Sequence, residues 1–136
     1  MATSGTEEIL SAIAKFVDAV NRGDQGDALA RLTNDVSIIE DLAPYRWQGP
    51  NAGSEWMQAM FENAQRIGIA SIAMQLGKAA RVEVEGRYAY AIVEGLLTYG
   101  GATPRRSDGL LTFALVQDER GWLIRALTWS GPVATV

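Results

Sequence analysis

The sequence predicts an α+β domain in which helices from the first half of the chain pack against an antiparallel sheet from the second half. Apolar residues recur at helical spacing as far as about residue 66, and from Ile69 onward they alternate with a period of two. Turns that contain Gly or Asp separate the alternating runs, as expected for strands joined by hairpins. A run of helices followed by a run of strands is typical of the α+β class.

The first half of the chain is expected to form three helices. The first begins near Thr6 and ends at residues 21–23, Asp24 caps a second that ends near residue 32, and a Gly-Pro pair introduces a third over residues 51–66. Their buried faces are defined by side chains at helical spacing: Ile9, Ile13, Phe16, Val17 and Val20 in the first, Ala28, Leu29 and Leu32 in the second, and Trp56, Met60, Phe61 and Ala64 in the third.

Five strands are expected. A short strand over residues 36–41 follows a break at residues 33–35. The four strands of the second half cover residues 69–84, with an irregularity at Gly77, and residues 87–99, 107–117 and 122–129. A turn at Glu85 and Gly86, a polar loop over residues 100–106 and a turn over residues 118–121 connect them.

Composition narrows the class of protein. A chain of 136 residues fits a single domain over residues 1–136, with a core over about 6–132, and a net charge of −4 gives no reason to expect nucleic-acid binding. The absence of Cys and His removes a thiol nucleophile, the commonest general base and the usual zinc ligands, so no metal and no cofactor are expected. With no secretion signal and no long apolar run, a cytoplasmic protein that does not bind membranes is expected.

The segment over residues 34–49 is the strongest candidate for a functional site. Glu40 and Asp41 follow an apolar strand and precede a turn that carries Tyr45 and Trp47. Apolar surroundings disfavour an ionised carboxyl and can make it a useful base. We expect Asp41 either to face a pocket or to cap its own turn. Glu40 points to the opposite strand face by alternation, and we expect it in solvent or at a subunit contact.

The order of these elements, ending in the segment GWLIRALTWSG, resembles the NTF2-like, SnoaL-like superfamily over residues 6–132. The resemblance implies a cone, in which a curved antiparallel sheet wraps the N-terminal helices and leaves an internal pocket open at one end. A shared fold does not by itself define a function.

A Gly-Asp between the first two helices, the Glu-Asp strand end and a Gly before the third helix are similar to the ketosteroid isomerases. That resemblance implies that Asp41 is the general base. The positions of the isomerases' two acidic hydrogen-bond donors hold Phe16, which has no hydroxyl, and Thr112 here, so both acidic donors are missing. Since one such donor is worth about 3–4 kcal/mol of activation barrier, steroid isomerisation is not the expected activity.

Other members of the superfamily differ from this chain as well. The histidine positions of the SnoaL-like cyclases correspond to Ala126 and Thr128, so the aspartate–histidine pair is incomplete. An aspartate with an arginine is similar to the limonene-epoxide-hydrolase branch, although the spacing in this chain does not reproduce it.

Arg125 is expected to act with Asp41. It shares a strand face with Leu127 and with Trp129, which lines the pocket in the isomerase comparison, so Arg125 is expected to point inward. An inward arginine needs an anionic partner. Either Asp41 or Glu94 forms a structural ion pair with it, or it binds an anionic group of a ligand.

Two functions are compatible with these patterns. The first is a cofactor-free isomerase, cyclase, dehydratase or hydrolase acting on a small apolar substrate, with Asp41 as base and Arg125 as electrostatic partner. The second is a non-catalytic domain that binds a small hydrophobic or partly anionic molecule or serves in dimerisation. In both, a homodimer through the outer sheet face is expected. Tyr45 and Trp47 are expected at the rim of the pocket, and the other candidate ligand-binding residues are Phe16, Trp56, Met60, Thr112 and Trp129.

Overall fold

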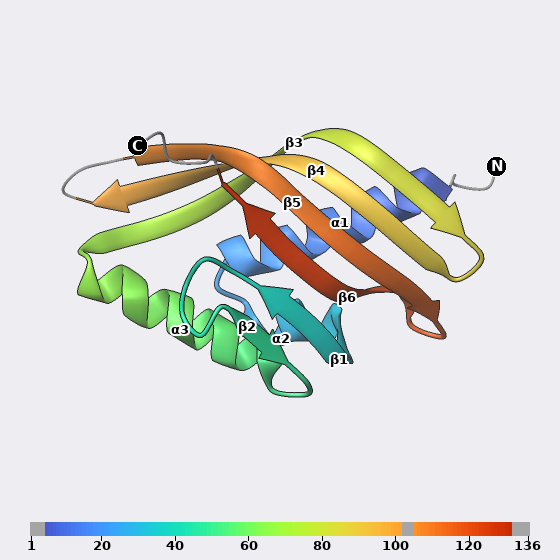
Figure 1. Ribbon diagram of the computed structural model, residues 1–136, viewed down its shortest axis with the longest axis horizontal. Helices are drawn as coiled ribbons and strands as arrows, with labels where there is room; N and C mark the ends of the chain where they lie inside the picture. The colour runs from blue at the N-terminus through green and yellow to red at the C-terminus, as the bar shows by residue number, and fades with distance from the viewer. Residues whose placement is uncertain (1–4, 102–104, 132–136) are drawn as a thin grey trace.

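The computed structural model describes residues 5–101 and 105–131, which form three helices and one six-stranded sheet (Figure 1). The elements in chain order are α1 (Gly5–Asn21), α2 (Gln25–Ala30), β1 (Leu32–Ile39), β2 (Arg46–Gln48), α3 (Ala52–Arg66), β3 (Ile69–Glu85), β4 (Tyr88–Gly101), β5 (Arg105–Asp118) and β6 (Gly121–Ser130). The α+β class is confirmed. The middle of the expected loop between β4 and β5, residues 102–104, lies outside the described residues.

The sheet has the strand order β2-β1-β6-β5-β4-β3. The antiparallel meander from β3 to β6 is as predicted. The sheet is not antiparallel throughout, however, because β1 runs parallel to β6. Parallel neighbours need a long crossover, and here the whole segment from β2 to β5 separates the two strands in the sequence.

The structure moves the predicted boundary between α2 and β1. Asp24 caps α2 as predicted, since its Oδ1 accepts a hydrogen bond from the backbone N–H of Asp27 at 3.1 Å. The helix nevertheless ends at Ala30, and the predicted break at residues 33–35 belongs to β1. A shift in the β1–β6 register between Leu32 and Ser37 accommodates these polar residues.

One continuous core fills the space between the helices and the sheet. In Figure 1, α1 lies behind the long strands. The core takes residues from α1, α2, α3 and from every strand except β3, and its most buried large side chains are Ile9, Ile13, Val36, Ile38, Phe113, Leu115 and Ile124. The predicted buried face of α3 is too wide. Trp56 is buried and Met60 is partly buried, but Phe61 is 59% exposed because it lies roughly 140° around the helix from Trp56.

Glycines allow the sheet to hold Trp129 closely. Gly95 and Gly109 are directly paired across β4 and β5. A Cβ atom at Gly109 would lie 2.5 Å from the Trp129 ring, and one at Gly95 would lie 3.1 Å from it. Glycine is therefore required at positions 95 and 109 by the close approach of the indole to the backbone. The predicted irregularity at Gly77, in the neighbouring strand β3, is confirmed by a register shift between β3 and β4.

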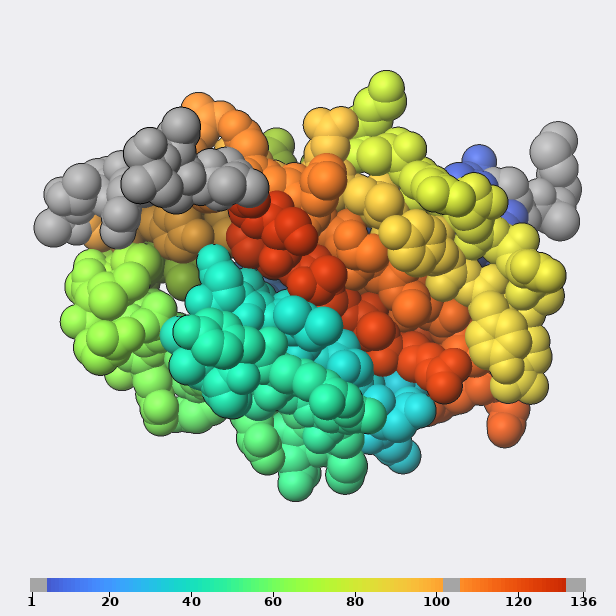
Figure 2. Space-filling view, viewed as in Figure 1, coloured from blue at the N-terminus to red at the C-terminus, as the bar shows by residue number. Residues whose placement is uncertain are grey.

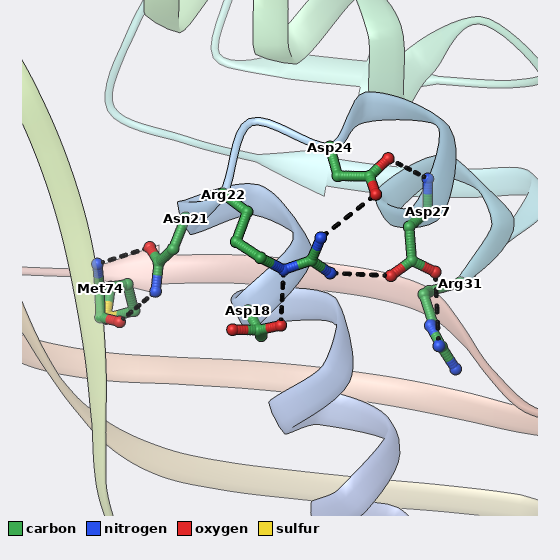
Figure 3. A network of polar contacts seen from close by, with 7 residues as sticks. All are labelled: Asp18, Asn21, Arg22, Asp24, Asp27, Arg31 and Met74. Carbon is green, nitrogen blue, oxygen red and sulfur yellow. Dashed lines mark hydrogen bonds and ion pairs between the residues drawn. The ribbon is translucent and has the colours of Figure 1, made fainter.

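A side chain at the end of α1 is bonded to the edge strand β3 (Figure 3). The Nδ2 of Asn21 donates to the carbonyl of Met74 at 2.8 Å, and its Oδ1 accepts from the N–H of Met74 at 2.9 Å. Beside it, the exposed Arg22 forms ion pairs with three carboxylates, those of Asp18, Asp24 and Asp27. The end of α1 is thus tied both to β3 and to the start of α2.

Within the described ranges, none of the helices has the length and apolar character needed to cross a membrane.

Candidate functional site

The carboxyl on the helix side of the sheet is that of Glu40, which follows β1 directly. Val36 and Ile38 of β1 are 2% and 0% exposed and face the core. Alternation continues this direction to Glu40, whose side chain is half-buried, whereas Asp41 is exposed. The predicted orientations of Glu40 and Asp41 are therefore reversed. The buried pair Val36 and Ile38 was the sequence signal that could have identified Glu40.

The surroundings of Glu40 favour its neutral form. Burial, and after it the neighbouring charge of Asp41, raise the pKa of the Glu40 carboxyl to about 7. The indole of Trp56 and the backbone N–H of Asp41 oppose this increase in pKa by interacting with the ionised form. Glu40 therefore changes its charge near neutral pH.

Two predicted pocket residues from different helices lie together beside Glu40. Trp56 of α3 is 5% exposed, and its ring stacks on that of Phe16 from α1 with 6.3 Å between the ring centroids and 16° between the planes. The indole nitrogen of Trp56 is buried and completes no hydrogen bond. Its interaction with Glu40 is therefore electrostatic and falls short of hydrogen-bond geometry.

The turn after Glu40 returns the chain to the sheet. The backbone N–H of Glu40 donates to the carbonyl of Tyr45 at 3.1 Å, and the N–H of Tyr45 donates to the carbonyl of Leu42 at 2.8 Å. Tyr45 has a positive φ of 72° and is 60% exposed, while the preceding Ala43–Pro44 peptide bond is cis. A rim position for Tyr45 stays a prediction.

The predicted rim position of Trp47 is wrong. Trp47 lies in β2 opposite Ile38, and cross-strand partners point to the same face of a sheet. Its side chain is 6% exposed and belongs to the core.

The predicted inward orientation of Arg125 is also wrong. Leu115 pairs with Ile124 and Ala114 pairs with Ala126, so Arg125 is the extra residue of a β-bulge. The bulge interrupts the alternation that would have aligned Arg125 with Trp129. The side chain of Arg125 is 52% exposed, and its Nε lies 3.8 Å from Oδ2 of Asp35, with which it forms a surface ion pair. The predicted partners, Asp41 and Glu94, are not in this pair.

The remaining candidates lie on two different faces. Trp129 is 9% exposed on the helix side, and because Ile39 pairs with Thr128, the register brings Glu40 to the level of Trp129. Thr112 faces the other way, since its neighbours Leu111 and Phe113 are in the core. The pocket position predicted for Thr112 is therefore wrong.

Thr112 lies instead in a hollow on the outer face of the sheet, whose strands β1, β6, β5 and β4 are side by side in Figure 2. This hollow has a volume of about 130 Å³ and is lined by Ser37, Ile39, Tyr90, Thr112, Phe113, Ala114, Ala126, Leu127 and Thr128. A second hollow of about 430 Å³ lies near the glycine pair and includes the exposed Glu94 together with Arg106 and Asp108. Neither hollow is lined by Glu40 or Trp56.

In the part of the chain that the structure describes, no three acidic side chains gather to form a metal site.

Solved structures define the class of fold. An NTF2-like protein with a cystatin-like fold from Novosphingobium aromaticivorans superposes with a TM-score of 0.78 at 18% identity, over 96% of this chain and 83% of that one. A ketosteroid isomerase-like protein from Erwinia carotovora atroseptica gives 0.74 at 16% identity, over 94% of this chain and 96% of that one. An NTF2-like protein of unknown function from Pseudomonas putida gives 0.76 at 18% identity, over 98% and 91%. At these identities the similarity shows the fold alone, an NTF2-like, cystatin-like domain.

A SnoaL-like domain matches residues 9–134, so the chain belongs to the SnoaL-like family. The predicted resemblance is thereby confirmed. No protein with a curated description matches the sequence significantly.

Proposed function

We propose that the protein is a cofactor-free enzyme that moves a proton on a small, mainly apolar molecule, with Glu40 as general base. The observation that carries this proposal is the half-buried carboxyl of Glu40, whose pKa is raised to about 7 next to Trp56 and Phe16. A general base is most effective when its pKa lies near the working pH. Isomerisation, cyclisation, dehydration and hydrolysis can all use such a proton transfer.

In this proposal the role of Asp41 is to raise the pKa of Glu40. Asp41 is exposed, and its negative charge is the second largest cause of the raised pKa of Glu40. The sequence-based assignment of Asp41 as base and the present assignment of Glu40 predict different variants to be inactive. The exposed position of Arg125 in its pair with Asp35 gives no support to a role for Arg125 in the reaction.

The test uses 5-nitrobenzisoxazole, a planar apolar molecule. Removal of its C–H proton by a base breaks the ring N–O bond and releases a coloured cyanophenolate. We expect turnover above the buffer rate that increases with pH through about 7, because Glu40 acts only when ionised. Glu40→Gln should reduce kcat/KM by at least about 100-fold, the typical contribution of a general base.

Asp41→Asn is the matched control. This variant should stay active, and the rising limb of its pH profile should move to lower pH, because it removes the neighbouring negative charge that raises the pKa of Glu40. An inactive Asp41→Asn variant with an active Glu40→Gln variant would restore Asp41 as the base. Full activity in both variants would exclude both Glu40 and Asp41 as the general base.

The second candidate function is a non-catalytic domain that binds a small ligand or serves in dimerisation. The outer face of the sheet supports dimerisation. Ile39, Tyr88, Tyr90 and Leu110 are between 39% and 53% exposed on this face, which the helices do not cover. Exposed apolar side chains that gather on one face are typical of protein interfaces. The proposed partner is a second copy of the chain, and the molar mass in solution tests it.

A further inference from the structure

The second hollow lies on the outer face of the sheet, away from the helices. Val93 of β4 is 2% exposed in the core, and a Cβ atom at Gly95 would meet the ring of Trp129. Alternation therefore directs Glu94 and Leu96 outward. A hollow of about 430 Å³ is within the size range of small-molecule sites. The sheet separates it from the proposed base, so binding here does not depend on the proposed function.

Three charged side chains surround this hollow. Glu94 comes from β4, Arg106 and Asp108 come from β5, and the side-chain amide of Gln75 from β3 also lines it. Within the described ranges, no ion pair or side-chain hydrogen bond joins any of the three charged groups to another residue. Two negative charges and one positive charge are thus available to a ligand.

The register places the positive charge and the negative charges at different levels of the hollow. Arg106 pairs with Thr98, and Asp108 pairs with Leu96. Glu94 lies two residues beyond Leu96 in β4. The backbone positions of Arg106 and Glu94 are therefore about 13 Å apart along the strands, at roughly 3.3 Å per residue. The half-buried Leu96 provides an apolar surface between them.

Gly77 leaves the space beside Glu94 open. Its φ is not positive, so the β-bulge at this point does not itself need glycine. A Cβ atom at Gly77 would lie 3.4 Å from Cβ of Glu94, an ordinary contact, whereas Gly95 and Gly109 are required by Trp129. Glycine inside a strand weakens it and often marks a place that a ligand approaches closely.

We propose that this hollow binds a small molecule with an ammonium group and a carboxylate at opposite ends of a short aliphatic chain. The ammonium group donates to Glu94 and Asp108, and the guanidinium of Arg106 holds the carboxylate. The aliphatic chain lies on Leu96, in the space that Gly77 leaves open. A simple cation would leave Arg106 unpaired, and an anion would leave the two acidic groups unpaired, so a zwitterion matches the hollow best.

Three matched probes test the proposal by NMR titration of the ¹⁵N-labelled protein. 6-Aminohexanoate carries both end groups, hexylamine carries only the ammonium group, and hexanoate carries only the carboxylate. We expect 6-aminohexanoate to give saturable shifts of the Gly77, Glu94 and Asp108 amide resonances at millimolar concentration. It should bind about two- to fivefold more tightly than either other probe, the effect of one exposed charge pair. Added salt should weaken its binding.

Gly77→Val is the central variant, because a valine side chain occupies the hollow and suits a strand. It should abolish binding of 6-aminohexanoate without lowering the unfolding temperature. Glu94→Gln and Arg106→Gln should each weaken binding about two- to fivefold, and Arg106→Gln should leave hexylamine binding unchanged. Glu85→Gln is the matched control, since Glu85 is an exposed carboxylate of β3 outside the hollow, and it should bind the probe like the wild type.

The absence of saturable shifts in the wild type, or equal affinities for the three probes, would overturn the proposal. The probe comparison uses the native protein, so it decides the question even if Gly77→Val fails to fold. A folded Gly77→Val variant with unchanged affinity would also overturn it. If Glu85→Gln weakened binding as much as Glu94→Gln, the net charge of the protein and not the hollow would attract the probe, which would contradict the site.

Discussion

At the scale of single residues, the ionisation of Glu40 has a cost that folding must bear. The folded protein binds a proton at Glu40 more tightly than the unfolded chain, because burial and Asp41 raise its pKa from 4.5 to about 7. The favourable contribution of proton binding at Glu40 to the unfolding free energy is fully present below pH 4.5, decreases as the pH rises, and is lost above about pH 7. Glu40 therefore destabilises the protein at neutral and alkaline pH relative to a neutral side chain.

Glu40→Gln tests this cost directly. The difference in unfolding free energy between variant and wild type should grow in favour of the variant from about pH 4.5 to pH 7 and then stay constant. In a fully buried group, a pKa shift of this size would change the unfolding free energy by more. We expect a change of about 1–2 kcal/mol because the Glu40 side chain is only half-buried. Urea unfolding across this pH range measures it. A difference that does not depend on pH would contradict the raised pKa.

Single residues also mark where sequence reasoning stops. The pattern Val36, Ile38, Glu40 contained the correct face for Glu40, but the resemblance to the isomerases assigned the pocket to Asp41. Arg125 could not be placed in the same way, because a β-bulge depends on the pairing of β6 with β5 and reverses the face of one residue. The outward direction of Thr112 likewise follows from which face the helices cover.

At the scale of elements, the contact between α1 and β3 is maintained by Asn21. The β3 strand is an edge of the sheet, and edge strands expose unpaired backbone groups. The Asn21 amide satisfies both backbone groups of Met74, at 2.8 and 2.9 Å. The neighbouring ion pairs of Arg22 are exposed, and such pairs contribute little to stability.

We expect Asn21→Ala to lower the unfolding free energy by about 1–2 kcal/mol, because two hydrogen bonds are lost and Met74 can turn to water for only part of their value. Asn21→Asp is the matched control, since it keeps the acceptor for the Met74 N–H and loses the donor to its carbonyl. Its loss should be intermediate. Thermal unfolding of the three proteins measures the series, and an alanine variant as stable as wild type would show that the contact is not structural.

At the scale of the whole molecule, the order of helices and strands was readable because each element carries its own periodicity and turn residues. The parallel pairing of β1 with β6 was not, since it joins segments far apart in the sequence. The register also aligns outward-facing residues of four strands into rows across the sheet. Ile92, Thr112, Thr128 and Ile39 form one row across β4, β5, β6 and β1, and Tyr90, Ala114, Ala126 and Ser37 form the next.

These rows form a shallow apolar trough on the outer face, and they lead to the last prediction. Small side chains lie in its middle, and the larger Ile39, Tyr90 and Leu110 lie around it, each at least 39% exposed. Such a shape can receive the same face of a second copy about a two-fold axis. We expect light scattering at micromolar concentration to give twice the chain mass of 14.7 kDa.

Leu110→Lys should shift this equilibrium to the monomer, because the single two-fold interface would bury two symmetry-related unpaired charges. Phe61→Lys is the matched control: Phe61 is 59% exposed on α3, away from the trough, so its substitution should leave the mass unchanged. A wild-type monomer, or the same mass for both variants and the wild type, would contradict the proposed interface. Loss of the dimer in Leu110→Lys alone would assign the trough to self-association, with the Glu40 site on the opposite side of the sheet left free to act in each subunit.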